Sequence, residues 1–82
     1  MKIFVYLLED NSFSFFYTGI TSDIDRRLKE HNSGNVKATS GKKPFKLVWF
    51  KGYNSYSDAR KHEKWLKKKN REYKLHLKEI GI

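Results

Sequence analysis

The sequence predicts an α+β fold, in which a three-stranded antiparallel sheet is flanked by about three helices in the order β-β-α-β-α-α. Apolar residues follow the two-residue period of strands in some segments and the 3.6-residue period of helices in others. Two polar signals that typically start helices precede helical segments, one at Ser22 to Asp25 and one at Ser55 to Asp58. The 82 residues fit one small domain, residues 1–82, and thirteen aromatic side chains supply its core.

Three segments have strand patterns. Residues Ile3–Leu8 are apolar on both faces, which predicts a central strand. Residues Phe13–Thr18 form the second expected strand, which Gly19 closes, and Phe45–Tyr53 form the third.

The register of the first hairpin can be estimated from its short polar turn. If Leu8 lies opposite Phe15, then Tyr6 lies opposite Tyr17 and shares a face of the sheet with it. The two tyrosine hydroxyl groups are then expected to meet on that face.

Helices are expected near residues 23–32, 55–69 and 71–79, with a break near Asn70 between the last two. In the first helix, Ile24, Leu28 and His31 form an inner stripe, and Arg27 falls on it. The adjacent Arg26 points about 100° away, toward solvent. Arg27 and His31 are therefore expected to be neighbours inside a cleft.

Glu63 lies in the most basic stretch of the chain, on what should be the buried face of the second helix. Tyr56, Ala59 and Leu66 share that face by helical spacing. A half-buried carboxylate costs free energy unless it is paired or holds a metal ion. Glu63 is thus a candidate metal ligand, and the structural alternative is an ion pair with a nearby Arg or Lys.

The net charge of +9 comes entirely from one half of the chain. Residues 42–82 hold thirteen basic and four acidic side chains, whereas residues 1–41 hold five of each. A one-sided basic surface is typical of nucleic-acid binding. The alternatives are a solvated lysine-rich helix and an anionic membrane, and the membrane is disfavoured because the basic helix lacks a broad apolar face.

Neither a secreted nor a membrane protein is expected. The apolar segment Ile3–Leu8 is too short for a signal peptide or a membrane span. The chain has no cysteine, which suits a reducing compartment. The expected location is the cytoplasm.

The order of these candidate residues resembles the GIY-YIG nuclease superfamily. The resemblance rests on Val5-Tyr6-Leu7, Tyr17-Thr18-Gly19, the helix Asp25–Asn32, and the segment Ala59–Lys64 with Lys67 and Arg71. It covers nearly the whole chain and is closest to small stand-alone bacterial members, similar to the N-terminal nuclease domain of the excinuclease C subunit. The chain departs from the pattern in two places, since Phe4 and Val5 precede Tyr6 and Thr18 replaces Ile.

The resemblance implies a metal-dependent endonuclease that hydrolyses phosphodiester bonds in DNA, in repair or recombination. Glu63 would be the protein ligand of Mg²⁺ or Mn²⁺, and Tyr6 would be the general base, with its pKa lowered by the metal and nearby cations. Arg27 would bind the scissile phosphate. Tyr17 and His31 would orient water or phosphate, and His31 could share the proton transfer.

The basic side chains supply the expected contacts to the phosphate backbone. The candidates are Lys42, Lys43, Arg60, Lys64, Lys67, Lys68 and Arg71. Two alternatives stay open, a non-catalytic nucleic-acid-binding module on the same fold and a small protein–protein adaptor. A partner protein could supply targeting, and the sequence leaves the oligomeric state open.

Overall fold

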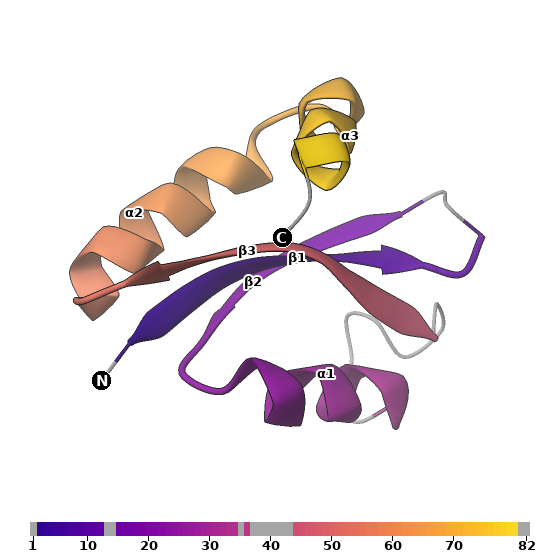
Figure 1. The fold of residues 1–82 in the computed structure, drawn as a ribbon, viewed down its shortest axis with the longest axis horizontal. Coiled ribbons are helices and arrows are strands. Elements are labelled where there is room, and N and C mark those ends of the chain that lie inside the picture. Colours follow the sequence, from indigo (N-terminus) through magenta and orange to yellow (C-terminus); the bar gives the residue numbers. More distant parts are fainter. Residues whose placement is uncertain (1, 13–14, 35, 37–43, 81–82) are drawn as a thin grey trace.

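The computed structural model describes residues 2–12, 15–34, 36 and 44–80, and its elements follow the predicted order β-β-α-β-α-α (Figure 1). The elements are β1 (Ile3–Asp10), β2 (Phe16–Thr21), α1 (Ile24–Asn32), β3 (Phe45–Tyr53), α2 (Tyr56–Lys67) and α3 (Arg71–Ile80). The predicted α+β fold class with a three-stranded antiparallel sheet is confirmed.

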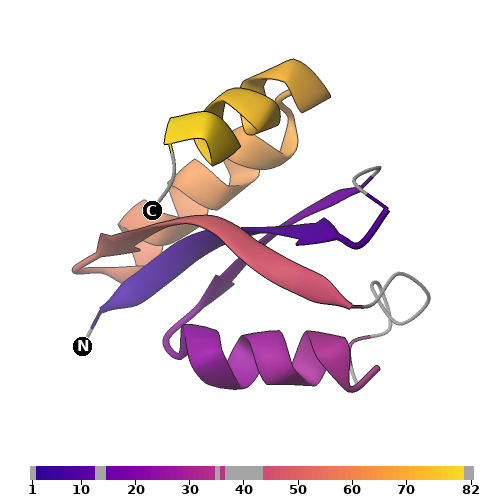
Figure 2. The ribbon, with the colours of Figure 1, turned by 45° about the vertical axis from the view of Figure 1, so that its right-hand side comes forward.

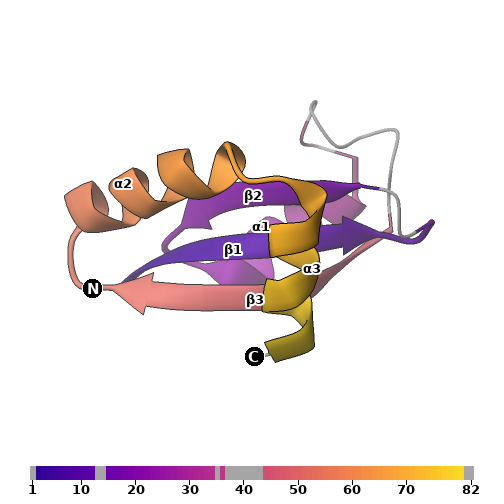
Figure 3. The same cartoon turned by 90° about the horizontal axis from the view of Figure 1, so that it is seen from above.

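The sheet has the strand order β2-β1-β3, with β1 antiparallel to both neighbours, so the predicted central strand is confirmed. Helix α1 covers one face of the sheet, and α2 and α3 cover the other (Figures 1 and 2). Seen from above, α2 runs along the side of the sheet that carries β2, while α3 crosses nearer β3 (Figure 3). The sheet therefore separates two layers of side chains.

Each face of the sheet has its own apolar core. The core under α2 and α3 consists of Val5, Leu7, Val48, Trp49, Ala59, Leu66 and Leu77. The smaller core beside α1 is built on Tyr6, Leu8 and Phe45, with Leu28 packed against it. Burying each large apolar side chain stabilises the fold by roughly 1.5–3 kcal/mol. Successive residues of β1 thus point alternately into the two cores, so this one strand packs against the helices on both faces.

The predicted register of the first hairpin is wrong by two residues. Tyr6 lies opposite Gly19 and Leu8 lies opposite Tyr17, and β2 begins at Phe16 rather than at residue 13. Asp10 explains the shift, because its carboxylate accepts hydrogen bonds from the Ser12 hydroxyl (2.6 Å) and the Phe15 amide (3.0 Å). These bonds close a longer turn than the sequence indicated. A shift of two residues keeps every side chain on its predicted face.

Most of the helix boundaries match the sequence signals. Ser55 caps α2 by accepting a hydrogen bond from the Asp58 amide at 3.1 Å. The predicted interruption between α2 and α3 lies at Asn70, whose side chain accepts a hydrogen bond from the Tyr73 amide. The cap of α1 differs from the predicted one, because the side chain of Asp23, and not that of Ser22, accepts a hydrogen bond from a backbone amide of the first turn. A carboxylate at that position also interacts favourably with the helix dipole.

The buried face of α2 contains three of the four residues that helical spacing predicted. Ala59, Glu63 and Leu66 are buried as expected, whereas Tyr56 is 60% exposed because it is the first residue of the helix. Within the described part of the chain, none of the helices has the length and hydrophobicity needed to cross a membrane.

Candidate active site

Three rings from three different elements meet beneath the sheet. The ring centroids of Tyr17 on β2 and His31 on α1 are 4.7 Å apart, and that of Tyr6 on β1 lies 6.2 Å from Tyr17 and 5.9 Å from His31. The Tyr6 hydroxyl also forms a 2.9 Å hydrogen bond with Nε2 of His31. Two sheet positions and one helix position thus bring together three of the five predicted catalytic residues.

Gly19 gives Tyr6 the space that this arrangement needs. Opposed residues of a sheet share a face, and a Cβ atom placed on Gly19 would overlap the hydroxyl end of the Tyr6 ring. The sequence indicated only that Gly19 closes a strand. In the structure, its missing side chain lets the phenol of Tyr6 lie across β2.

We expect Gly19→Ala to lower the free energy of unfolding by about 1–3 kcal/mol, the usual cost of overpacking a filled site. Urea denaturation measures it. Gly52→Ala is the matched control on β3, because a Cβ atom there would meet the Lys2 side chain at 3.1 Å and the Phe4 ring at 3.2 Å, which is a milder approach. Equal stability losses in the two variants would contradict the special role of Gly19.

Arg27 joins the cluster from α1, as the sequence predicted. Its side chain is about one-third exposed, whereas that of Arg26 is 67% exposed, so the two arginines separate as the helical period requires. The Arg27 guanidinium donates a hydrogen bond of 2.9 Å to Glu30. It also acts on Tyr6 through hydrogen bonding and charge, both of which counter the rise in the pKa of Tyr6. These contacts with Glu30 and Tyr6 hold the pKa of Arg27 above its usual range.

His31 is fully buried, and neighbouring contacts fix its position. The next residue, Asn32, bonds to both backbone groups of Phe45, accepting from the amide at 2.5 Å and donating to the carbonyl at 3.0 Å. Burial and the charge of Arg27 together lower the pKa of His31 to about 4, against the opposing effect of Glu30. His31 is therefore neutral at pH 7. A neutral imidazole whose Nε2 carries no proton can accept the hydroxyl proton of Tyr6 across the 2.9 Å hydrogen bond.

The neutral state of His31 predicts a loss of stability in acid. The unfolded chain, with a His pKa near 6.5, binds more protons than the native state between about pH 6.5 and pH 4. The free energy of unfolding should therefore fall as the pH drops through this window. Urea denaturation at several pH values should give a shallower fall for His31→Gln. His62 has a pKa lowered in the same direction, so the difference between the two proteins is the quantity to use. Parallel curves would contradict the burial of a neutral His31.

The protonation state of Tyr6 differs from the expectation of a lowered pKa. Burial raises the pKa of Tyr6 to about 12, although the hydrogen bond from Arg27 opposes this effect. Burial outweighs the guanidinium because the phenol lies under the sheet, with 2% of its surface exposed. In the metal-free chain, Tyr6 is a hydrogen-bond donor and not a phenolate.

Glu63 lies on α2, the helix that covers the face of the sheet opposite α1. It is 3% exposed on α2, and its carboxylate contacts Nη1 of Arg60 at 2.8 Å and Nζ of Lys67 at 3.4 Å. The ion pair that the sequence left as an alternative is present, and its partners are an Arg and a Lys of the same helix. The charge of Glu63 nevertheless contributes to raising the pKa of Tyr6, so the two groups interact electrostatically.

The surroundings of Glu63 are compatible with a metal ion bound by one protein ligand. Mg²⁺ commonly takes one or two carboxylates and completes its octahedron with water and phosphate oxygens. The described residues contain no cluster of three or more His, Cys, Asp or Glu side chains that could hold a metal without such outside ligands. The side chains of Arg60 and Lys67 are about half exposed, so both can turn into solvent when a metal ion replaces them at the buried carboxylate.

Two residues of this region were missed at the sequence level. Glu30 holds Arg27 in place, and its i,i+3 spacing from Arg27 could have revealed it. Asn32 ties the end of α1 to β3 over a gap of thirteen residues, and no local signal in the sequence marks that contact.

The predicted phosphate-binding side chains are spread over several environments. Lys42 and Lys43 lie outside the described residues. Lys64 on α2 and Lys68 at its C-cap are exposed, whereas Arg60 and Lys67 contact Glu63. The guanidinium of Arg71 lies 5.2 Å from the centre of the Phe16 ring.

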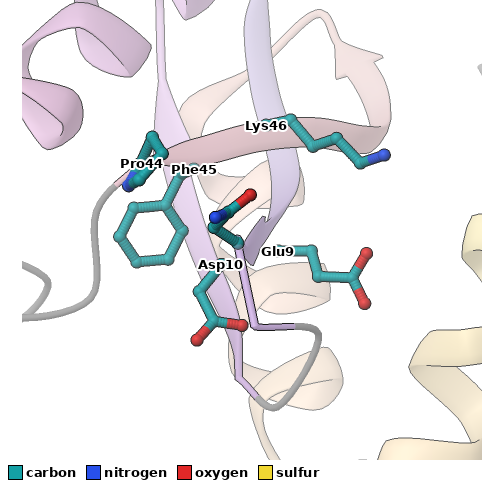
Figure 4. Close-up of a pocket in the computed structure, with 6 residues that line it drawn as sticks. Glu9, Asp10, Pro44, Phe45 and Lys46 are labelled. Carbon is teal, nitrogen blue, oxygen red and sulfur yellow. The ribbon is translucent and has the colours of Figure 1, made fainter.

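A hollow of about 140 Å³ lies where β1 ends and β3 begins, and Phe45 in its lining also belongs to the core that holds Tyr6. It is lined by Glu9, Asp10, Asn11, Pro44, Phe45 and Lys46 (Figure 4). Both of its carboxylates have structural partners, since Glu9 contacts Lys78 at 2.7 Å and Asp10 closes the hairpin turn. These partners favour the tyrosine cluster over the hollow as the reactive centre.

Comparison with known proteins gives consistent matches. The sequence pattern of the GIY-YIG catalytic domain matches residues 2–76. The UPF0213 protein of Haloquadratum walsbyi is 40% identical over 95% of this chain and 88% of its own length. The corresponding protein of Clostridium perfringens is 39% identical over 90% of this chain and 80% of its own length. The solution NMR structure of the UPF0213 protein BH0048 from Bacillus halodurans is 40% identical, covers 98% of this chain and 85% of its own, and superimposes with a TM-score of 0.60.

Proposed function

The chain belongs to the GIY-YIG family, and from that membership we propose that it is an endonuclease that hydrolyses phosphodiester bonds in DNA with the help of Mg²⁺ or Mn²⁺. The GIY-YIG catalytic domain by itself suggests a nuclease. The observation that carries the proposal further is the cluster of Arg27, Tyr6 and His31, in which the Tyr6 hydroxyl bonds to Nε2 of His31 at 2.9 Å and the Arg27 guanidinium acts on the pKa of that hydroxyl. It joins a fixed cation, a hydroxyl group and a neutral base.

Arg27 is the group that binds the scissile phosphate. Its planar guanidinium matches two phosphate oxygens, and its positive charge persists at every pH of interest. Because Glu30 and Tyr6 already hold the side chain, little conformational entropy is lost when the phosphate binds. Arg27 stabilises the negative charge that develops as water attacks phosphorus.

Tyr6 and His31 act together on the proton of the attacking water. Tyr6 accepts this proton on its oxygen while its own hydroxyl proton passes to Nε2 of His31, 2.9 Å away. As the oxygen of the water bonds to phosphorus, the bond between phosphorus and the leaving oxygen breaks. Tyr6 stays neutral in this path, which agrees with a pKa raised to about 12. Tyr17 packs against the His31 ring and positions it.

Glu63 is the proposed ligand of the metal ion. A bound Mg²⁺ or Mn²⁺ would offset negative charge on the phosphate and on the leaving oxygen. Glu63 contributes a buried carboxylate whose cationic neighbours, Arg60 and Lys67, can turn toward the DNA backbone. The remaining cations, Lys42, Lys43, Lys64, Lys68 and Arg71, would bind phosphates without reading sequence.

We place this activity in DNA repair or recombination in the cytoplasm, with a partner protein supplying the target site. The core is small, and specific protein–DNA interfaces usually bury about 1,000 Å² or more of protein surface. The isolated chain should therefore cleave slowly and prefer flexible or unpaired DNA.

The second candidate is a nucleic-acid-binding module without catalysis. It is favoured by the ion pairs of Glu63 with Arg60 and Lys67, because a carboxylate in that state is a structural element. The two candidates share the basic surface and differ in the need for metal.

A supercoiled-plasmid assay with Mg²⁺ or Mn²⁺ tests the proposal, alongside a gel-shift measurement in EDTA. A nuclease converts the plasmid to the nicked form only when metal is present, in proportion to enzyme concentration. Binding in EDTA without nicking at any metal concentration would instead establish the binding module.

A further inference from the structure

A row of aromatic rings runs across α2 on the layer opposite the tyrosine cluster. It starts on β3 and ends on α3, and its members are Trp49, Tyr53, His62, Trp65 and Tyr73. Neighbouring ring centroids lie 5.4–5.7 Å apart, and the Tyr53 hydroxyl bonds to Nδ1 of His62 at 2.6 Å. Neither the proton path nor the proposed metal site uses these rings.

Trp65 is the exposed member of this row. It is 45% exposed, whereas Trp49 at its inner end is 9% exposed. Tyr73 meets the indole edge-on at 88°, and His62 supports it from one turn earlier in the helix. These contacts fix the orientation of a large apolar ring at the surface. A fixed exposed indole is suited to stacking, because little side-chain entropy is lost when a ligand covers it.

Cations surround the exposed indole. Nζ of Lys69 lies over one face of the Trp65 ring, 4.3 Å from its centre, so this flexible side chain has to turn aside, toward a phosphate, when a base stacks on that face. Lys61 and Lys68 are exposed and occupy the i−4 and i+3 positions, so they flank Trp65 on the helix surface. Positive charge on both sides of an aromatic ring complements a ligand in which phosphates alternate with flat bases.

We propose that Trp65 is a stacking platform for an unpaired base of single-stranded nucleic acid, with Lys61, Lys68 and Lys69 binding the adjacent phosphates. This inference rests on the proposed function only in taking nucleic acid as the partner. A paired base within a duplex is stacked on its neighbours and does not present a free face to the indole. An apolar protein partner fits poorly, because three lysines would have to be desolvated with it.

Fluorescence titration in EDTA tests stacking directly. Trp49→Phe leaves Trp65 as the only tryptophan. We expect oligothymidylate to quench its emission, and an oligomer of abasic nucleotides with the same number of phosphates to bind without that quenching. Equal quenching by the two oligomers, or none by either, would overturn the platform.

Affinity measurements on the otherwise native chain give the second test. Trp65→Ala should weaken binding of single-stranded oligothymidylate by about 10-fold or more, and Trp65→Phe should retain most of the affinity. Both variants should bind a duplex hairpin within about 2-fold of the native chain. Tyr56→Ala is the matched control, because Tyr56 is an exposed aromatic residue on the same helix, 2.5 turns away on its other side.

The failures of the two proposals are distinguishable because every binding measurement is made without metal. Single-stranded affinity that is unchanged in Trp65→Ala would overturn the platform and leave the nuclease proposal standing. Absence of plasmid nicking, with Trp65 quenching intact, would overturn the nuclease and leave the platform standing.

Discussion

Glu63→Gln is expected to abolish metal-dependent nicking while the protein stays folded and binds DNA. Glutamine keeps the size of the side chain but removes the charge that a divalent cation needs from its protein ligand. The fold should survive, because Arg60 and Lys67 are about half exposed and can be solvated when the carboxylate is gone. The measurement is the rate at which supercoiled plasmid is lost with Mg²⁺, together with thermal unfolding by circular dichroism.

Glu79→Gln is the control for this experiment. Glu79 is exposed on α3, so its substitution makes the same change in net charge without touching the proposed site. We expect nicking within about 2-fold of the native rate for this variant. Undiminished nicking by Glu63→Gln would assign the metal to another ligand.

Arg27→Ala is expected to lower the nicking rate by at least about 10²-fold, the usual cost of removing a group that stabilises transition-state charge. It removes the phosphate contact and the hydrogen bond to Tyr6 together. Arg27→Lys should restore only part of the activity, because an ammonium lacks the planar fork. Single-turnover rates with enzyme in excess separate this chemical effect from weaker binding.

The neighbouring Arg26 provides the matched control. Its side chain is 67% exposed, and its substitution by alanine removes the same charge from the same helix. A small effect of Arg26→Ala beside a large effect of Arg27→Ala would place the chemistry on the inner face of α1. Equal losses in the two variants would reduce Arg27 to a general electrostatic role.

Local periodicity predicted the elements well, whereas the hairpin register needed information that it does not carry. Apolar residues on both faces of the segment identified β1 as central, and the helical period predicted that Arg27 points inward and Arg26 outward. The register instead depends on how the turn closes. The carboxylate of Asp10 decides that closure by binding the Ser12 hydroxyl and the Phe15 amide, and a period of two cannot reveal this choice.

The candidate site was predictable as a set of residues, but its electrostatics were not. The order of the motifs along the chain identified Tyr6, Tyr17, Arg27 and His31 as candidates, and the structure places these four residues together. The raised pKa of Tyr6 depends on burial under the sheet, which is a property of the packed molecule. The space above Gly19 likewise appears only when β1 and β2 are paired.

Which cations pair with Glu63 depends on side-chain conformation, which the helical period alone does not give. Arg60 and Lys67 adjoin Glu63 on the surface of α2, and their long side chains reach its carboxylate while staying about half exposed. Their i,i+3 and i,i+4 spacings from Glu63 were the available signal.

Whether Glu63 and the Tyr6 cluster form one metal site is measured most directly by NMR titration with substoichiometric Mn²⁺. Paramagnetic broadening acts first on the nuclei nearest the ion. We expect the signals of Glu63, Tyr6 and Gly19 to broaden before all others in the native chain, and to stay sharp at the same Mn²⁺ concentration in Glu63→Gln. Broadening that begins at Glu9 and Asp10, or that is unchanged by Glu63→Gln, would contradict a metal-dependent active site built on these residues.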